Sequence, residues 1–117
     1  MAYIEAMVAA VPTADKAAYL DYAREVGSLF KQHGALATTD CWGSDVPEGK
    51  LTSFPLAVKC GPGETVAIGW ITWPSKEARA TAWEALMKEP KMQPGAMKMP
   101  FDGKRMIYGG FEVILQL

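Results

Sequence analysis

Three carboxylates stand in apolar segments of the chain, where acid–base chemistry could occur. Glu5 lies inside YIEAMVAAV, Glu112 lies inside FEVIL, and Asp40 is close to Trp42. A carboxylate in an apolar space, especially beside a second one, has its pKa raised and can act as a general base. Glu112 and Glu5 are therefore candidate catalytic residues, and Asp40 is a weaker candidate. The structural alternative is that Glu112 or Glu5 faces water at a rim or pairs with Lys104 or Arg105.

A second candidate site is the segment KMPFDGKRMIYGG, residues 98–110. Lys104 and Arg105 could hold an anionic group, because the guanidinium fork can donate two hydrogen bonds to a carboxylate. Phe101 and Tyr108 could pack against the apolar part of the same ligand. The structural alternative is a turn at the Asp-Gly pair that carries solvated charges and starts a strand. The candidate binding residues are Phe101, Lys104, Arg105, Tyr108, Trp42 and Trp70.

The connection that precedes this segment, residues 88–104, is long and contains three prolines. Long irregular connections are uncommon in compact domains and often act as lids or binding loops. This one carries Met92, Met97 and Met99, whose polarizable thioethers adapt to irregular apolar ligands. The same methionines could instead fill the core or contact another subunit.

Composition excludes several classes of function. With 12 basic and 13 acidic side chains the net charge is −1, so the basic surface typical of nucleic-acid binding is missing. One histidine, His33, and two distant cysteines, Cys41 and Cys60, cannot build a structural zinc site without acidic residues. We expect no metal and no cofactor, and we find neither a nucleophile motif nor a phosphate-binding glycine loop.

The amino terminus also predicts where the protein resides. The segment MAYIEAMVAAVPTADK lacks a basic stretch ahead of an apolar one, and no run approaches the ~20 apolar residues of a membrane span. Two cysteines in a cytosolic chain are expected to stay reduced. We therefore expect a cytoplasmic protein that does not bind membranes, folded as a single domain over residues 1–117.

Hydrophobic periodicity predicts the elements that position these residues. Residues 3–11, 35–43, 65–73 and 105–117 read as strands. A first helix, with Thr13 as a candidate cap, ends at His33-Gly34, and a second runs from Pro74-Ser75 to about Lys88. The apolar stripe of the first helix consists of Tyr22, Ala23, Val26, Leu29 and Phe30.

The order βαββαβ predicts an α+β, ferredoxin-like fold. Right-handed crossovers place the first and third strands at the centre of a four-stranded antiparallel sheet, with both helices on one face. In the last strand Ile107 and Phe111 share one face, and Tyr108 and Glu112 share the other. The sequence leaves open which of them meets the helices, and we consider the case in which Ile107 and Phe111 do. Glu112 and Glu5 would then point away from the helices.

The uncovered face of such a sheet should be polar, but here it is apolar. The first and third strands carry apolar side chains on both sides, and an exposed apolar sheet usually marks an interaction surface. We expect two sheets to pack face to face in a two-fold dimer. The alternative is that a long loop folds back over the face.

Several segments resemble the YbaA-like bacterial proteins, a family of unknown function. They are HGAL, CWGSDVPEGKLTSFPLAVK, ETVAIGWITWPSKEAR and, most specifically, PFDGKRMIYGGFEV. The resemblance covers essentially the whole chain. It implies the dimeric α/β-barrel architecture, in which two ferredoxin-like sheets pack face to face, and it brings no catalytic residues with it.

These observations lead to three hypotheses on function. The first is binding of a small, partly apolar molecule that could carry an anionic group, in a pocket between the sheet and the 88–104 loop. The alternative is a non-catalytic module that assembles as a homodimer. A lesser alternative, by analogy of fold alone, is a cofactor-independent monooxygenase or isomerase.

Overall fold

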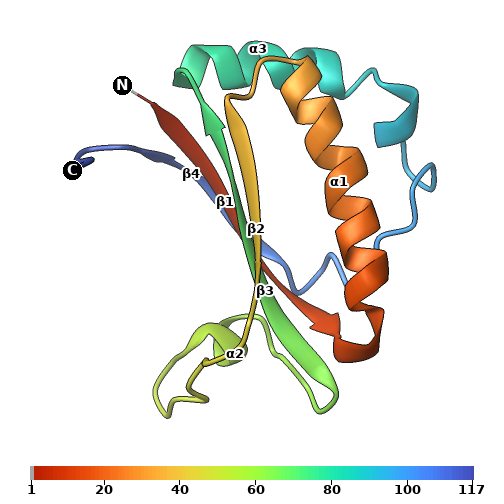
Figure 1. Ribbon diagram of the computed structural model, residues 1–117, viewed down its shortest axis with the longest axis vertical. Helices are drawn as coiled ribbons and strands as arrows, with labels where there is room; N and C mark the ends of the chain where they lie inside the picture. The colour runs from red at the N-terminus through yellow and green to blue at the C-terminus, as the bar shows by residue number, and fades with distance from the viewer. Residues whose placement is uncertain (1) are drawn as a thin grey trace.

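The computed structural model describes residues 2–117 as one four-stranded antiparallel sheet with helices on both of its sides (Figure 1). The strands are β1 (Tyr3–Pro12), β2 (Ala37–Trp42), β3 (Glu64–Trp73) and β4 (Ile107–Glu112). The helices are α1 (Lys16–Gln32), α2 (Phe54–Ala57) and α3 (Lys76–Leu86). Short 3-10 turns span Thr13–Asp15 and Pro90–Met92.

The strand order is β2-β3-β1-β4, and every neighbouring pair is antiparallel. β1 and β3 therefore form the centre and β2 and β4 the edges, as predicted. α1 and α3 cover one face of this sheet, which we call the helix face (Figure 1). The short α2 and its flanking loop lie on the other, open face, near the start of β3 (Figure 1).

The core lies between the helix face and the two long helices. Trp73 and Leu86 are fully buried there, where β3 meets α3. Most of the stripe predicted for α1 faces this core, with Val26, Leu29 and Phe30 buried. Alternation along β1 places Tyr3, Glu5, Met7, Ala9 and Val11 on the helix face.

The helix ends follow local side-chain chemistry only in part. α3 begins after Pro74-Ser75 as expected, and Ser75 caps it, because its hydroxyl accepts a hydrogen bond from Ala78 N at 3.0 Å. The prediction that Thr13 caps the first helix is wrong. Thr13 lies in a 3-10 turn, and its hydroxyl is 2.7 Å from that of Thr65 on β3.

The structure settles which face of β4 meets the helices, and it is not the face considered from the sequence. The register pairs Met7 with Tyr108 and Tyr3 with Glu112, so Tyr108 and Glu112 share the helix face. Ile107 and Phe111 lie on the open face instead. Glu5 points toward the helices as well, and neither carboxylate faces away from them. An alternating strand offers two faces, and only its register decides which one meets the helices.

The glycine pair in β4 gives a test of this register. Tyr3 packs against Gly110, and a Cβ added at Gly110 would overlap with the Tyr3 hydroxyl. We expect Gly110→Ala to lower the free energy of unfolding by about 1–3 kcal/mol in urea titrations, because buried Tyr3 has little room to move. The matched control is Gly109→Ala, whose Cβ would lie 3.5 Å from the nearest atom. Equal stabilities of the two variants would contradict the register.

Candidate functional site

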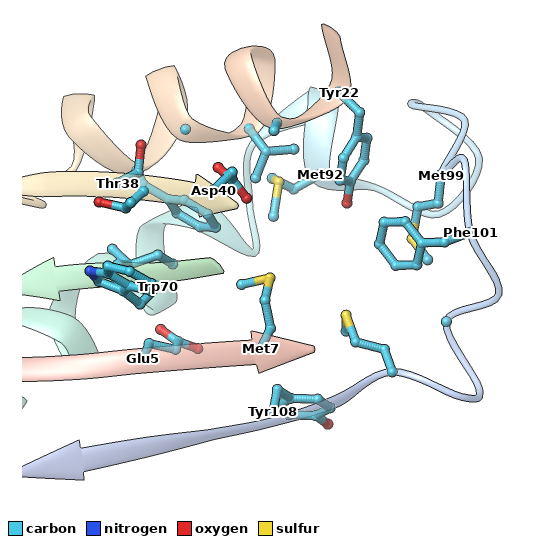
Figure 2. Close-up of a pocket in the computed structure, with 18 of the residues that line it drawn as sticks. Glu5, Met7, Tyr22, Thr38, Asp40, Trp70, Met92, Met99, Phe101 and Tyr108 are labelled. Atoms are coloured by element: carbon cyan, nitrogen blue, oxygen red, sulfur yellow. The ribbon is translucent and has the colours of Figure 1, made fainter. Parts of the chain in front are cut away.

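A cavity of about 590 Å³ lies between α1, the helix face of the sheet and the long loop, residues 87–106, that joins α3 to β4. Its lining comes from all of these elements (Figure 2). Met7 contributes from β1, Tyr22 from α1, and Phe101 from the long loop. The loop that the sequence suggested as a binding loop thus forms one wall of the cavity.

Methionines make up much of the apolar lining. Met7, Met92, Met99 and Met106 all border the cavity. Figure 2 shows Met7, Met92 and Met99 around the same open space. Unbranched thioether side chains can change rotamer at low cost, so this wall can adapt to different apolar shapes. Met97, also expected at a binding surface, packs against the core instead.

Aromatic rings gather at the end of the cavity where the long loop meets α1. The rings of Tyr22 and Phe101 meet edge to face, with centroids 5.7 Å apart. Tyr19 lies 6.1 Å from Phe101 and 6.0 Å from Trp42, also between ring centroids. Such tilted pairs are favourable geometries for aromatic rings. They attach the loop to α1 at this end.

Glu5 forms the polar base of the opposite end. Its side chain is buried, and its Oε1 accepts hydrogen bonds from Trp83 Nε1 at 2.9 Å and Trp73 Nε1 at 3.3 Å. Arg79 donates from Nε to Oε1 at 3.2 Å and from its terminal nitrogen to Oε2 at 3.1 Å. The carboxylate is therefore fully engaged. Glu5 has the structural ion pair that was the alternative to catalysis, although its partner is Arg79.

Asp40 lies at the rim of the cavity, on edge strand β2. Its Oδ1 accepts a hydrogen bond from the Tyr19 hydroxyl at 3.2 Å. Asp40 is exposed, but partial desolvation by the groups around it raises its pKa, and the hydrogen bond from Tyr19 offsets part of this rise. Burial and the neighbouring Asp40 raise the pKa of Tyr19 well above its ordinary value, so the hydroxyl keeps its proton and remains the donor.

The other predicted site residues divide into two groups. Phe101 and Tyr108 border the cavity. Trp70 borders it too, although alternation along β3 directs its side chain to the face opposite Ile71. Lys104, Arg105, Trp42 and Glu112 do not line it. Of the three carboxylates considered for catalysis, Glu5 and Asp40 therefore reach the cavity and Glu112 does not.

Arg105 is held at the start of β4. Its two terminal nitrogens each donate to a Glu64 carboxylate oxygen at 2.8 Å, and Nε donates to Asp102 at 3.2 Å. The Asp102 side chain also accepts from the Lys104 backbone N–H at 3.0 Å, as expected of a turn. Arg105 thus joins the long loop to the start of β3, and its fork is occupied by carboxylates of the same chain.

Sequence reasoning missed several residues of the site. Met7, Arg79 and Trp83 line the cavity but were not proposed. Tyr22 was assigned only to the apolar stripe of the first helix.

Within residues 2–117, no group of three or more His, Cys, Asp or Glu side chains is placed to hold a metal ion. None of the described helices has the length and apolar character needed to cross a bilayer.

The Arg105–Glu64 pair predicts an acid-sensitive stability. Hydrogen bonds from Arg105 and from the Gly61 N–H lower the pKa of Glu64 from 4.5 to about 2. A lowered pKa means that the stabilisation is present above the ordinary value of 4.5 and is lost as pH falls toward about 2. We expect Glu64→Gln to lose less stability than the unmodified chain across this interval, measured by urea unfolding. Exposed Glu48→Gln is the control and should keep the original slope. Identical slopes for all three proteins would contradict the pairing.

Comparison with known proteins places the chain in a family. The family model described as a protein of unknown function, DUF1428, matches residues 2–103. The uncharacterized protein YbaA of Escherichia coli strain K12 is 50% identical over 115 residues, which cover 98% of each chain. The YbaA protein of Shigella flexneri shows the same identity and coverage. The chain therefore belongs to the DUF1428 family, and the resemblance to YbaA-like proteins is confirmed.

Proposed function

We propose that this member of the DUF1428 family binds a small, largely apolar molecule in the cavity between α1, the helix face and the long loop. The observation that carries the proposal is the cavity itself. Its volume, about 590 Å³, falls in the range of small-molecule sites, roughly 300–1,000 Å³. Methionine and aromatic residues make up half of its lining, with a smaller number of polar residues, which is the usual composition of such sites.

The charged side chains that line the cavity test the suggestion from the sequence that the ligand carries an anionic group. Among residues 2–117, Arg79 is the one cation that lines the cavity, and it is bonded to Glu5. Lys104 and Arg105 are not part of the lining. The support is therefore for an apolar body and not for a negatively charged ligand.

A cavity-filling substitution tests the proposal. N-phenyl-1-naphthylamine is a neutral probe whose fluorescence rises in apolar surroundings, and we expect it to bind the unmodified chain. Ala23 borders the cavity on α1, so Ala23→Phe should fill part of the space and reduce probe affinity about tenfold or more. The control, Ala17→Phe, adds the same ring at an exposed position of α1.

Thermal unfolding of both variants, followed by circular dichroism, checks that each remains folded. A folded Ala23→Phe that binds the probe as tightly as Ala17→Phe would place binding elsewhere. In that case the cavity would not be the ligand site.

A second candidate function, assembly of a ferredoxin-like homodimer through the open face, is favoured by the exposed side chains of that face. Phe111 is 58% exposed and Ile107 is 44% exposed, on the side of β4 away from α1 and α3. Beyond β4, Ile114 is 86% exposed. Two such faces packed as a barrel would remove these side chains from water. This is the assembly that the dimeric α/β-barrel architecture implies.

Part of the open face is covered within the chain. Val58, which follows α2, is fully buried against Ala10 and Val66 at the end of the sheet near the start of β3. The loop between β2 and β3 thus covers one end, as the alternative to a dimer required. The exposed Phe111 and Ile107 lie on β4, on the part of the face left for a second copy.

A charge placed on the open face should distinguish a dimer that packs through this face from a monomer whose face is covered only by its own loop. We expect the unmodified chain to run as a dimer in native mass spectrometry and light scattering, and Phe111→Asp to raise the dimer dissociation constant at least about a hundredfold. The control, Leu20→Asp, places the same charge on α1, where Leu20 is 47% exposed. A monomeric unmodified chain would contradict the dimer.

The two cysteines, Cys41 and Cys60, are free thiols in the structure. We propose that the protein resides in the cytoplasm, where reducing conditions would keep both thiols unpaired.

A further inference from the structure

We propose that the ligand of this cavity carries a protonated amine, bound at the rim by the Asp40 carboxylate and by the rings of Tyr22 and Phe101. This inference rests on the proposed function of the cavity and names the chemical class of its ligand. The ligand would be an amine with an apolar body, the amine at the rim and the body among the methionines.

The charge balance of the lining is the first argument. The charged side chains that border the cavity are Glu5, Asp40 and Arg79. Glu5 and Arg79 neutralise each other through two hydrogen bonds of 3.1 and 3.2 Å. Among residues 2–117, no basic group lies within 4.0 Å of an Asp40 oxygen. The cavity therefore presents one uncompensated negative charge, and a cationic group is its natural partner.

The geometry around Asp40 is the second argument. The Tyr19 hydroxyl holds Oδ1, whereas Oδ2 accepts no hydrogen bond from the described residues. Gly69, the β3 neighbour of Asp40, makes room for the carboxylate, since a Cβ there would come within 2.6 Å of Oδ1. Figure 2 shows Asp40 between β2 and α1, on the side of the cavity. One oxygen is thus positioned by the protein and the other remains available to a donor on a ligand.

The aromatic rings are the third argument. A cation within about 6 Å of an aromatic ring is attracted to its negative face. Tyr22 and Phe101 both border the cavity, and Tyr19 connects them to Asp40 because it packs on Phe101 and donates to the carboxylate. The same aromatic cluster already holds one cation, because Lys16 Nζ lies 5.8 Å from the ring centroid of Trp42.

The remainder of the lining suits the apolar part of such a ligand. From Asp40 the cavity continues past Met7 and Met92, with Met99 and Phe101 on the long loop (Figure 2). Thioether and aromatic side chains can surround an aliphatic chain or a ring without requiring one shape. The contact between Asp40 and the amine would then give specificity, and the methionines would accept apolar groups of different shapes.

The test uses three probes that share one naphthylmethyl body and differ in charge. They are the cation 1-naphthylmethylamine, the neutral alcohol 1-naphthylmethanol and the carboxylate 1-naphthaleneacetate. Isothermal titration calorimetry of the full chain near neutral pH gives their dissociation constants. We expect the amine to bind about tenfold to a hundredfold more tightly than the alcohol, which is the usual value of a charged hydrogen bond. The acetate should bind most weakly, because it meets the charge of Asp40.

Two variants assign this preference to named groups. Asp40→Asn should remove most of the advantage of the amine over the alcohol while leaving the affinity of the alcohol unchanged. The control is Asp21→Asn, which removes the same charge from an exposed ion pair with Arg24 on α1. Tyr22→Leu keeps an apolar side chain but removes a ring, so it should weaken the amine several-fold relative to the alcohol. This second variant keeps the test decisive if Asp40→Asn does not fold.

The outcomes separate the inference from the function on which it rests. Equal binding of the three probes, or tightest binding of the acetate, would overturn the amine while leaving the cavity as a binding site. An amine preference that survives both Asp40→Asn and Tyr22→Leu would also overturn it. Failure of all three probes to bind would overturn the proposed function itself.

Discussion

The structure depends most on the burial of one carboxylate, Glu5, at the centre of the sheet. A buried charge without partners costs several kcal/mol, so the chain must bring donors to it from other elements. Trp73 supplies one from β3, and Arg79 and Trp83 supply the rest from α3. These bonds fix the position of α3 relative to β1. Because Glu5, Arg79 and Trp83 also line the cavity, the same cluster defines its base.

The cavity persists because the long loop is held at both ends and apolar between them. At its start, His33 Nε2 lies 2.8 Å from Glu89, and the Gln93 side chain donates to the carbonyl groups of Met87 and Glu89. At its end, Arg105 joins it to Glu64. Between these attachments, methionines and Phe101 face the sheet across an open space. A loop that is fixed at both ends and carries flexible apolar side chains between them is suited to bind a ligand.

The sequence predicted those features that local patterns determine. Alternation and helical periodicity located the strands and the two long helices, and the chain order predicted the central position of β1 and β3. What it could not predict depends on partners far along the chain. Glu5 and Arg79 are 74 residues apart, and Glu64 and Arg105 are 41 apart. No local signal links either pair, so Arg105 was assigned to a ligand. The faces of β4 could not be assigned for the same reason, since register is a property of two strands together.

Ligand binding at this site requires a cavity that is formed before any ligand arrives. A crystal structure under xenon pressure tests this requirement, because xenon enters apolar cavities without specific contacts. We expect xenon bound among Met7, Tyr22 and Phe101, with the long loop in its present position. A structure in which Met92, Met99 and Phe101 have closed onto the sheet, with no xenon beneath α1, would contradict it.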